Sequence, residues 1–292
     1  DAGGRFIGVS TSDKGKINSF FKKLWRLGSE SGFHQMFMGW GLRPGRDGDW
    51  YERTKKSYPD VMKWEQEYPT TAEEALSPSQ GECYFDIETL KQLLGTALTI
   101  PSGIYKKPVI TRRYGAWIDP AGMGKDRHSL SMIDCQTGEV VVDYTNTLPR
   151  DEFALGAYGI LGRYQYPMLG IESNGVGEAM IDALKAVGYP VAKFCMHGAK
   201  NEKFGVPSSS QFRDRILPDL AEGIRQGGIV IYSKEMISEC FSFIRNEKGR
   251  PAAALGAHDD RVMAVAGAQW VTKQIPMIPQ RQNEGKMRYA RA

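Results

Sequence analysis

Two acidic residues in this sequence each stand where a short apolar segment ends. Asp119 follows the apolar segment 114–118 and precedes Pro120, and a proline cannot donate to a β ladder, so it ends a strand. Glu172 follows a second apolar segment, 168–171. A carboxylate at the end of a stiff strand is held in one place, as a catalytic or metal-binding group must be.

A further acidic position is the pair Asp259-Asp260, which stands directly before an apolar segment. We expect a helix over 259–272, with both carboxylates at its N-terminus, where the helix dipole favours negative charge. If parallel strands bring Asp119 and Glu172 together, the acidic groups converge on one edge of a sheet. Like charges that close need a cation between them, and oxygen ligands select a hard ion, Mg²⁺ or Mn²⁺. Two such ions about 4 Å apart can activate a water and stabilise the leaving oxygen of a phosphodiester.

Each carboxylate also has a purely structural interpretation. Asp119 could cap its own turn, and Glu172 could be a plain strand-end residue. Asp259 or Asp260 could be only a helix N-cap. The order in which they occur along one α/β pattern favours the metal-binding interpretation over these separate ones.

The two adjacent aspartates are expected to play different parts. A helix starting at His258-Asp259 makes Asp259 the N-cap, with its carboxylate accepting from the amide of Arg261 or Val262. Asp260 then heads a face of small residues that lets the helix lie close to the sheet, namely Ala264, Gly267 and Ala268. We therefore predict Asp260 as the metal ligand and Asp259 as the cap or as support for a ligand. His258 could support a ligand too, or make only a structural hydrogen bond.

Strands and helices alternate from Tyr114 onward. Three short strands, two of them joined at a hairpin signal over 136–138, precede a series of helices and further strands. This order predicts an α/β domain with a mixed sheet flanked by helices. The expected strands are 114–119, 129–135, 140–144, 168–172, 190–194 and 229–232, and the expected helices are 151–164, 176–187, a segment opening at Ser208, and 259–272.

The sequence predicts three regions, with limits at 1–85, 86–273 and 274–292. The first is a separate compositional block, and the last is a basic tail expected to be mobile. The boundary near 83–87 is followed by an expected helix and basic connector over 88–113. Within the first block we expect a strand over 6–10, an amphipathic helix over 17–27, a charged helix over 61–67 and a short helix near 67–75.

The composition is that of a soluble globular protein, with 41% hydrophobic and 25% charged residues in a chain of 292. A net charge of +4 permits an anionic partner without requiring one. The four cysteines lie far apart without a Cys-x-x-Cys motif, which argues against a zinc knuckle or a disulfide framework and suits a reducing cytoplasm. No apolar segment approaches the length of a membrane span, so no membrane association is expected.

Several basic residues are expected to flank the acidic edge and to contact phosphate groups of a nucleic acid. A solvated charged face is the alternative explanation for them. These candidate DNA-binding residues are Lys193, Lys200, Lys203, Arg213 and Arg215.

The order strand-Asp, hairpin, helix, strand-Glu and helix-Asp-Asp resembles the RNase H-like nuclease fold. Within that fold it is most similar to the large terminase subunit of tailed bacteriophages and prophages. The resemblance covers nearly the whole chain, and its specificity lies in the ordered set of motifs. The matching segments are 118–122 with Lys125-Asp126, 171–175 with Gly177, 258–260 with Met263-Ala264, 9–15 with Asn18, Phe20 and Trp25 (similar to the motif that follows the ATPase core), and 67–75 (similar to the segment that leads into the nuclease).

This resemblance implies a metal-dependent endonuclease that cuts concatemeric double-stranded DNA with little sequence preference during packaging of a phage genome. It implies two ions, Mg²⁺ or Mn²⁺, held by Asp119, Glu172, Asp259 and Asp260. The implied partners are a small terminase subunit, the portal ring and sister large subunits, in the cytoplasm of the bacterial host.

The sequence departs from a complete terminase motor. Such a motor needs a Gly-x-x-x-x-Gly-Lys-Ser/Thr phosphate loop, and this sequence contains none, because 14–16 and 124–125 lack the second glycine and the hydroxyl residue. An acidic pair for magnesium and the attacking water should precede Phe6, where the sequence has only Asp1. We therefore expect a small remnant of a P-loop ATPase domain before a whole nuclease, with the front half absent, and no ATP hydrolysis by this chain.

Two other interpretations stay open at this point. Another RNase H-like enzyme, of the junction resolvase or transposase type, would share the carboxylates, but the block 1–85 favours a terminase. A non-catalytic docking or DNA-binding module would carry the same carboxylates as structural groups. Divalent-metal binding distinguishes that module from a nuclease.

Overall fold

A central mixed sheet organises the larger part of the molecule. The computed structural model describes residues 6–11, 13–14, 16, 19–58, 61–77, 83–122, 127–197, 203–207, 209–246 and 249–276. The sheet has the order β3-β2-β1-β4, in which β1 pairs with β2 and β2 with β3 antiparallel, and β1 pairs with β4 parallel. Its strands are β1 (Tyr114–Asp119), β2 (His128–Asp134), β3 (Val140–Asn146) and β4 (Met168–Ile171).

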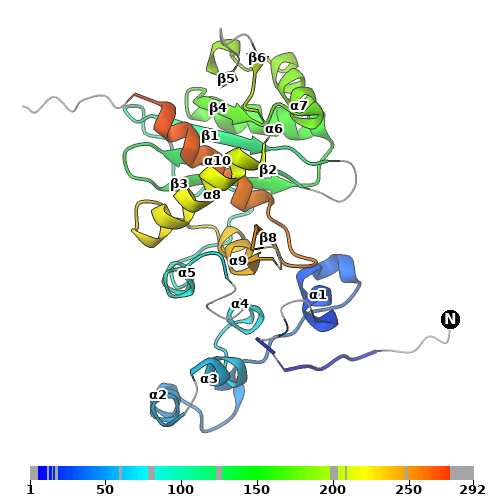
Figure 1. Cartoon of the computed structure of the whole chain (residues 1–292), viewed down its shortest axis with the longest axis vertical. Helices are drawn as coiled ribbons and strands as arrows, with labels where there is room; N and C mark the ends of the chain where they lie inside the picture. Colours follow the sequence, from blue (N-terminus) through cyan, green and yellow to red (C-terminus); the bar gives the residue numbers. More distant parts are fainter. Residues whose placement is uncertain are drawn as a thin grey trace, which may run out of the picture.

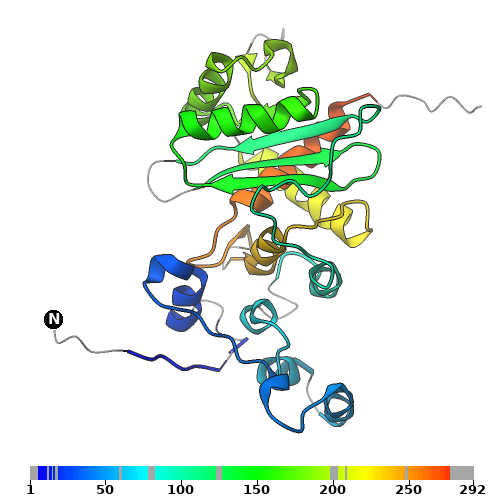
Figure 2. The ribbon, with the colours of Figure 1, turned by 180° about the vertical axis from the view of Figure 1, so that it is seen from behind.

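Helices cover both faces of this sheet. Figure 1 shows α8 (Ser210–Arg225) and α10 (Asp260–Gln274) across one face, and Figure 2 shows α6 (Arg150–Arg163) on the opposite face, where α7 (Gly175–Ala186) also lies. Because side chains alternate along a strand, Trp117 belongs to the apolar core under α8 and α10, whereas Ala116 and Ile118 belong to the core under α6 and α7. The prediction of a mixed sheet flanked by helices, in an RNase H-like order, is confirmed.

Helix α10 lies unusually close to the sheet. A Cβ atom on Gly267 would stand 2.1 Å from Cδ2 of Trp117, and one on Gly115 would stand 2.8 Å from the backbone nitrogen of Thr272. Ala264 and Ala268, on the same helical face as Gly267, are fully buried. The expected face of small residues therefore allows the close approach, and the two glycines leave room for the Trp117 ring and for the helix backbone.

We predict that Gly267→Ala lowers the free energy of unfolding by about 3 kcal/mol or more, because the new methyl group overlaps a buried indole ring between packed elements. Gly159→Ala in α6 is the matched control, since a Cβ there meets nothing within 4 Å. That control should raise stability by about 0.5–1 kcal/mol through its better helix propensity. Urea denaturation of the two variants measures the difference, and equal midpoints would contradict the packing argument.

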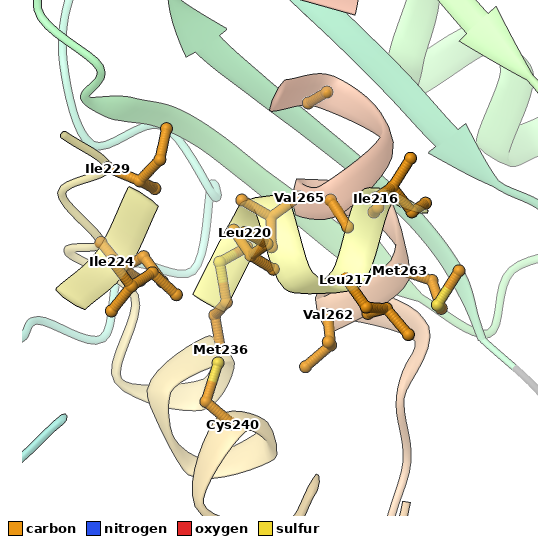
Figure 3. Packing of buried hydrophobic residues seen from close by; sticks show 14 of the residues in the cluster. Ile216, Leu217, Leu220, Ile224, Ile229, Met236, Cys240, Val262, Met263 and Val265 are labelled. Atoms are coloured by element: carbon orange, nitrogen blue, oxygen red, sulfur yellow. The ribbon is translucent and has the colours of Figure 1, made fainter. Parts of the chain in front are cut away.

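Apolar side chains from three helices meet beneath the sheet. Figure 3 shows Ile216, Leu217 and Leu220 of α8 beside Val262 and Val265 of α10, with α9 (Lys234–Ser242) below them. All five of these side chains are buried, and their position makes α9 a support for the N-terminal part of α10. Sequence analysis did not predict α9.

The N-terminal region folds as short helices at the end of the molecule away from the sheet (Figure 1). Trp64 is fully buried there, in contact with the rings of Trp50, Tyr51, Tyr58 and Tyr68. The helices are α1 (Phe20–Arg26), α2 (Gly48–Ser57), α3 (Val61–Glu67) and α4 (Ala72–Leu76), with two 3₁₀ turns (Gly28–Ser31 and Trp40–Leu42), and they are followed by α5 (Ile87–Leu94).

Ion pairs connect this region to α5. Glu65 of α3 binds both Lys14, at 3.0 Å, and Lys91 of α5, at 2.8 Å. These contacts cross the domain limit expected at 85/86. The division into domains and the origin of residues 1–85 in an ATPase domain stay predictions.

Some expected elements are wrong. Residues 6–10 form no strand, and Phe6 and Ile7 are 75% and 84% exposed, since an isolated apolar segment gains nothing as a strand without a partner. The segment 190–194 is mainly a 3₁₀ helix (Val191–Lys193), in which Pro190 fixes the entry and only Phe194 bridges β4. The helix expected over 88–113 ends at Leu94, and 229–232 makes only an isolated bridge, at Val230.

Two short hairpins were not expected. β5 (Met196–His197) pairs with β6 (Lys203–Phe204), and β7 (Phe243–Arg245) pairs with β8 (Pro251–Ala253). Ser208, where a helix was expected to open, lies outside the described residues; α8 is capped by Ser209, whose side chain accepts from the amide of Phe212 at 3.0 Å. Most of the expected tail, from residue 277 on, also lies outside them. No helix in the described part of the chain is long and apolar enough to span a bilayer.

Candidate active site

The parallel pairing of β1 and β4 places Asp119 and Glu172 side by side. Ile118 is in register with Ile171, and each acidic residue is the next one along its own strand. After Glu172 the chain turns into α7, which Asn174 caps by accepting from the amide of Gly177 at 2.8 Å. A Cβ on Gly177 would stand 1.7 Å from the carbonyl oxygen of Glu172, so this sharp turn requires glycine.

The direction of α10 brings its N-terminus to the same strand ends. Thr272, near the C-terminus of α10, lies against Gly115, and Gly267 lies against Trp117. The helix therefore runs antiparallel to β1, and its N-terminal residues lie toward Asp119, on the same face of the sheet as Trp117.

The electrostatics of Asp119 show that the four predicted carboxylates share one site. The pKa of Asp119 is raised well above its ordinary value, first by burial and then by the negative charges of Glu172, Asp260 and Asp259. The positive charge of Arg213 opposes this shift. The structure thus brings together all four acidic residues that sequence analysis singled out, along with one of the predicted basic residues.

Asp259 and Asp260 differ in their partners. The carboxylate of Asp259, 35% exposed, accepts from Nη2 of Arg213 at 3.0 Å. The carboxylate of Asp260 is 16% exposed, and its Oδ2 is buried without a hydrogen bond from any described residue; the nearest ionisable partner is Nδ1 of His258, 3.5 Å away. A buried acceptor without a donor is costly, and a cation would remove that cost.

The expected cap of α10 is wrong in its source. Asp259 stands at the N-cap position, but its side chain makes no capping hydrogen bond. The amide of Arg261 donates instead to Oε2 of Glu239 on α9, at 2.9 Å. Asp259 is paired with Arg213, on a different helix, and this pairing leaves the capping position to Glu239. Sequence analysis missed Glu239, and the available signal was an acidic residue within the apolar stripe of Met236 and Cys240.

His128 is a second residue that was missed. Its Nδ1 accepts from the amide of Ala121 at 2.9 Å, so the ring holds the chain where it leaves β1 after Asp119. Burial lowers the pKa of His128 first, and the charge of Arg150 lowers it further, which keeps Nδ1 able to accept. No sequence spacing pointed to this residue.

The donor set suits a hard divalent cation. Among the described residues, no three histidine, cysteine, aspartate or glutamate side chains stand ready-made around a common point. Even so, the four carboxylates act on one another strongly enough to shift the pKa of Asp119, and the buried oxygen of Asp260 lacks a donor in the part of the chain that the structure describes. Oxygen ligands with unsatisfied lone pairs and mutual repulsion fit Mg²⁺ or Mn²⁺ better than a softer metal.

The other predicted basic residues lie in different surroundings. Lys193, Lys203 and Arg215 are exposed, and Arg215 also stacks over the ring of Phe212 at 5.8 Å. Of the predicted basic residues that the structure describes, Arg213 alone contacts a predicted metal ligand. The remaining residue, Lys200, lies outside the described residues, as do Lys125 and Asp126 of the first motif.

The chain matches no family model and no curated protein. Among solved structures it is similar to the large terminase nuclease of thermophilic phage G20c, at 19% identity and a TM-score of 0.47, over 62% of this chain and 97% of that one. The magnesium-bound form of that nuclease gives 20% and 0.48, over 61% and 95%. The large terminase of another thermophilic bacteriophage gives 12% and 0.41, over 89% of this chain and 60% of that one. The solved structures similar to this chain thus include large terminase nucleases and a large terminase, the family that its sequence motifs resemble.

Proposed function

We propose that this chain is a divalent-metal-dependent endonuclease that cuts double-stranded DNA with little sequence preference. The observation that supports this most is the group of four carboxylates at the strand ends, with one buried oxygen left without a donor among the described residues. Asp119, Glu172 and Asp260 would hold Mg²⁺ or Mn²⁺, with Asp259 beside them. Two bound ions would supply an activated water and charge stabilisation at the leaving oxygen.

The residues of the chain itself supply position and charge. The rigid ends of β1 and β4 hold Asp119 and Glu172, and the close packing of Gly267 on Trp117 fixes the height of α10 above them. Arg213 is paired with Asp259 and 43% exposed. Its guanidinium can therefore turn toward a phosphate of bound DNA while it stays beside the acidic site.

We further propose that this nuclease belongs to the packaging terminase of a phage or prophage. The support is the ordered set of motifs, including those of residues 1–85, which a resolvase or transposase does not need. On this proposal the substrate is concatemeric DNA, the partners are a small terminase subunit, the portal ring and sister large subunits, and the site of action is the cytoplasm of the bacterial host. The absence of a phosphate loop from the sequence leaves ATP hydrolysis to a part other than this chain.

Incubation of supercoiled plasmid with the purified chain tests the proposed activity. We expect nicked and then linear DNA with MnCl₂ or MgCl₂ and unchanged plasmid in EDTA, because the carboxylates cannot activate water without a cation. Fragments of random length would accompany low sequence preference. Cutting of equal rate in EDTA would contradict metal dependence, and Mn²⁺ binding without any cutting would favour a non-catalytic DNA-binding module.

We predict that DNA binding is driven by phosphate contacts and weakens with salt. Replacing Lys193 and Lys203 together by alanine should weaken binding to two unrelated duplexes equally and reduce the slope of log K against log salt by about one per lost contact. Fluorescence anisotropy in EDTA over a series of NaCl concentrations measures this. Lys55→Ala, an exposed lysine of α2, is the control and should change nothing. A sequence preference that persists at high salt would contradict the prediction.

A further inference from the structure

The first turn of α10 takes its cap from another helix. A helix leaves its first backbone N–H groups without partners, and the Asp259 side chain satisfies none of them. Oε2 of Glu239 accepts from the amide of Arg261 at 2.9 Å, and Arg261 directly follows Asp260. The carboxylate that fixes the start of this helix therefore comes from α9, although Asp259 stands at the capping position.

Glu239 is itself held in place by the same residue. Its Oε1 accepts from Nη1 of Arg261 at 2.8 Å, while Nε of Arg261 donates to Oδ2 of Asp143 at 3.0 Å. The side chains of Glu239, Asp143 and Arg261 are 8%, 2% and 12% exposed. Ser233 also donates to Oδ2 of Asp143, at 2.5 Å. Buried charges with so many mutual hydrogen bonds have little freedom to move.

This polar network continues into the sheet. Oδ1 of Asp143 accepts from Oγ1 of Thr145 at 2.9 Å, and Thr145 shares a hydrogen bond of 2.8 Å with Ser129. Ser129 is the residue paired with Asp119 across β1 and β2. A continuous set of hydrogen bonds therefore runs from the start of α10 to the strand position opposite Asp119.

We propose that Glu239 is a positioning residue that sets the start of α10 and thereby fixes Asp260 relative to Asp119. The proposal deepens the nuclease function proposed above and rests on it. Both oxygens of Glu239 are occupied by Arg261, so Glu239 acts through that residue and does not bind the metal. Its capping role leaves Asp259 free to pair with Arg213, and leaves the inner oxygen of Asp260 for a cation.

The test compares Glu239→Ala, Glu239→Gln and a control on the same helix, Glu235→Gln, whose carboxylate bonds to Thr99 instead. Two quantities are measured on the full chain without DNA. These are the hydrogen-exchange rate of the Arg261 amide in EDTA and the Mn²⁺ dissociation constant by calorimetry.

We expect Glu239→Ala to speed the exchange of the Arg261 amide and to weaken Mn²⁺ binding about 10–100-fold, as loss of a residue that orients a metal ligand does. Glu239→Gln keeps an acceptor for that amide, so it should retain the protection and bind Mn²⁺ with intermediate affinity. The Glu235→Gln control should match the unmodified chain in both measurements. Circular dichroism at the measuring temperature verifies that each variant is folded, and Glu239→Gln serves alone if Glu239→Ala is not.

Unchanged exchange at Arg261 in Glu239→Ala would overturn the positioning role, whatever the metal result. Unchanged Mn²⁺ affinity with faster exchange would also overturn it, because the cap would then be structural only. If the unmodified chain binds no Mn²⁺, the proposed nuclease function fails, and the positioning of Asp260 for a metal falls with it. The exchange data would then separately report whether Glu239 caps α10.

Discussion

Asp119→Ala is expected to reduce metal-dependent DNA cleavage about a thousandfold or more. Asp119 is the residue whose charge interacts with all three other carboxylates, so its loss removes the ligand common to the whole group. A metal centre contributes several kcal/mol to the transition state, and each 1.4 kcal/mol is a factor of about ten in rate. The rate of plasmid linearisation in MnCl₂ measures the loss. Asp182→Ala, which removes an exposed carboxylate of α7, is the control and should cut normally.

The same position should gain stability when its charge is removed. The pKa of Asp119 is raised in the folded protein, so the folded state keeps this proton to higher pH than the unfolded chain does. Stability is then lost as pH rises from the ordinary carboxyl pKa through the raised one. Asp119→Asn does not titrate, so in EDTA its unfolding midpoint should exceed that of the unmodified chain, by more at pH 8 than at pH 5. A lower midpoint at pH 8 would mean that the charge is stabilised, contrary to the site described above.

The parts of the fold that local pattern determines were predictable from sequence. The strand ending at Asp119 and the strand ending at Glu172 follow from short apolar segments bounded by turn residues, and α6, α7 and α10 begin and end within one or two residues of expectation. Convergence of the carboxylates followed from one further assumption, that these two strands are parallel neighbours. The pairing of β1 with β4 bears that assumption out.

The parts that depend on contacts between distant segments were not predictable. The cap of α10 was expected from Asp259 because capping is usually local, but the structure takes it from Glu239, on a helix that periodicity did not reveal. The segment 6–10 has the composition of a strand, yet a strand forms only where a partner offers its hydrogen bonds. His128 supports the loop after Asp119 through a ring nitrogen, a contact that no spacing in the sequence indicates.

The two adjacent aspartates should respond differently to the loss of one charge. Asp260→Asn is expected to lower Mn²⁺-dependent cleavage about a hundredfold or more, because an amide oxygen is a poorer ligand than a carboxylate for a hard cation. Asp260 also carries the buried oxygen that has no hydrogen-bond donor among the described residues. Asp259→Asn should keep most of the activity, since the amide oxygen can still accept from Arg213 at the position where the carboxylate does now.

Initial cutting rates at saturating MnCl₂ and the Mn²⁺ dissociation constant separate the two roles. For Asp260→Asn both quantities should change, whereas for Asp259→Asn the metal affinity should stay within about threefold, since one neutralised outer charge only weakens the local field. The reverse pattern would place the ligand at Asp259 and the pairing with Arg213 outside the active form. Equal losses would mean that both carboxylates bind metal, in which case Arg213 must leave Asp259 when the ions enter and becomes available to the DNA phosphate.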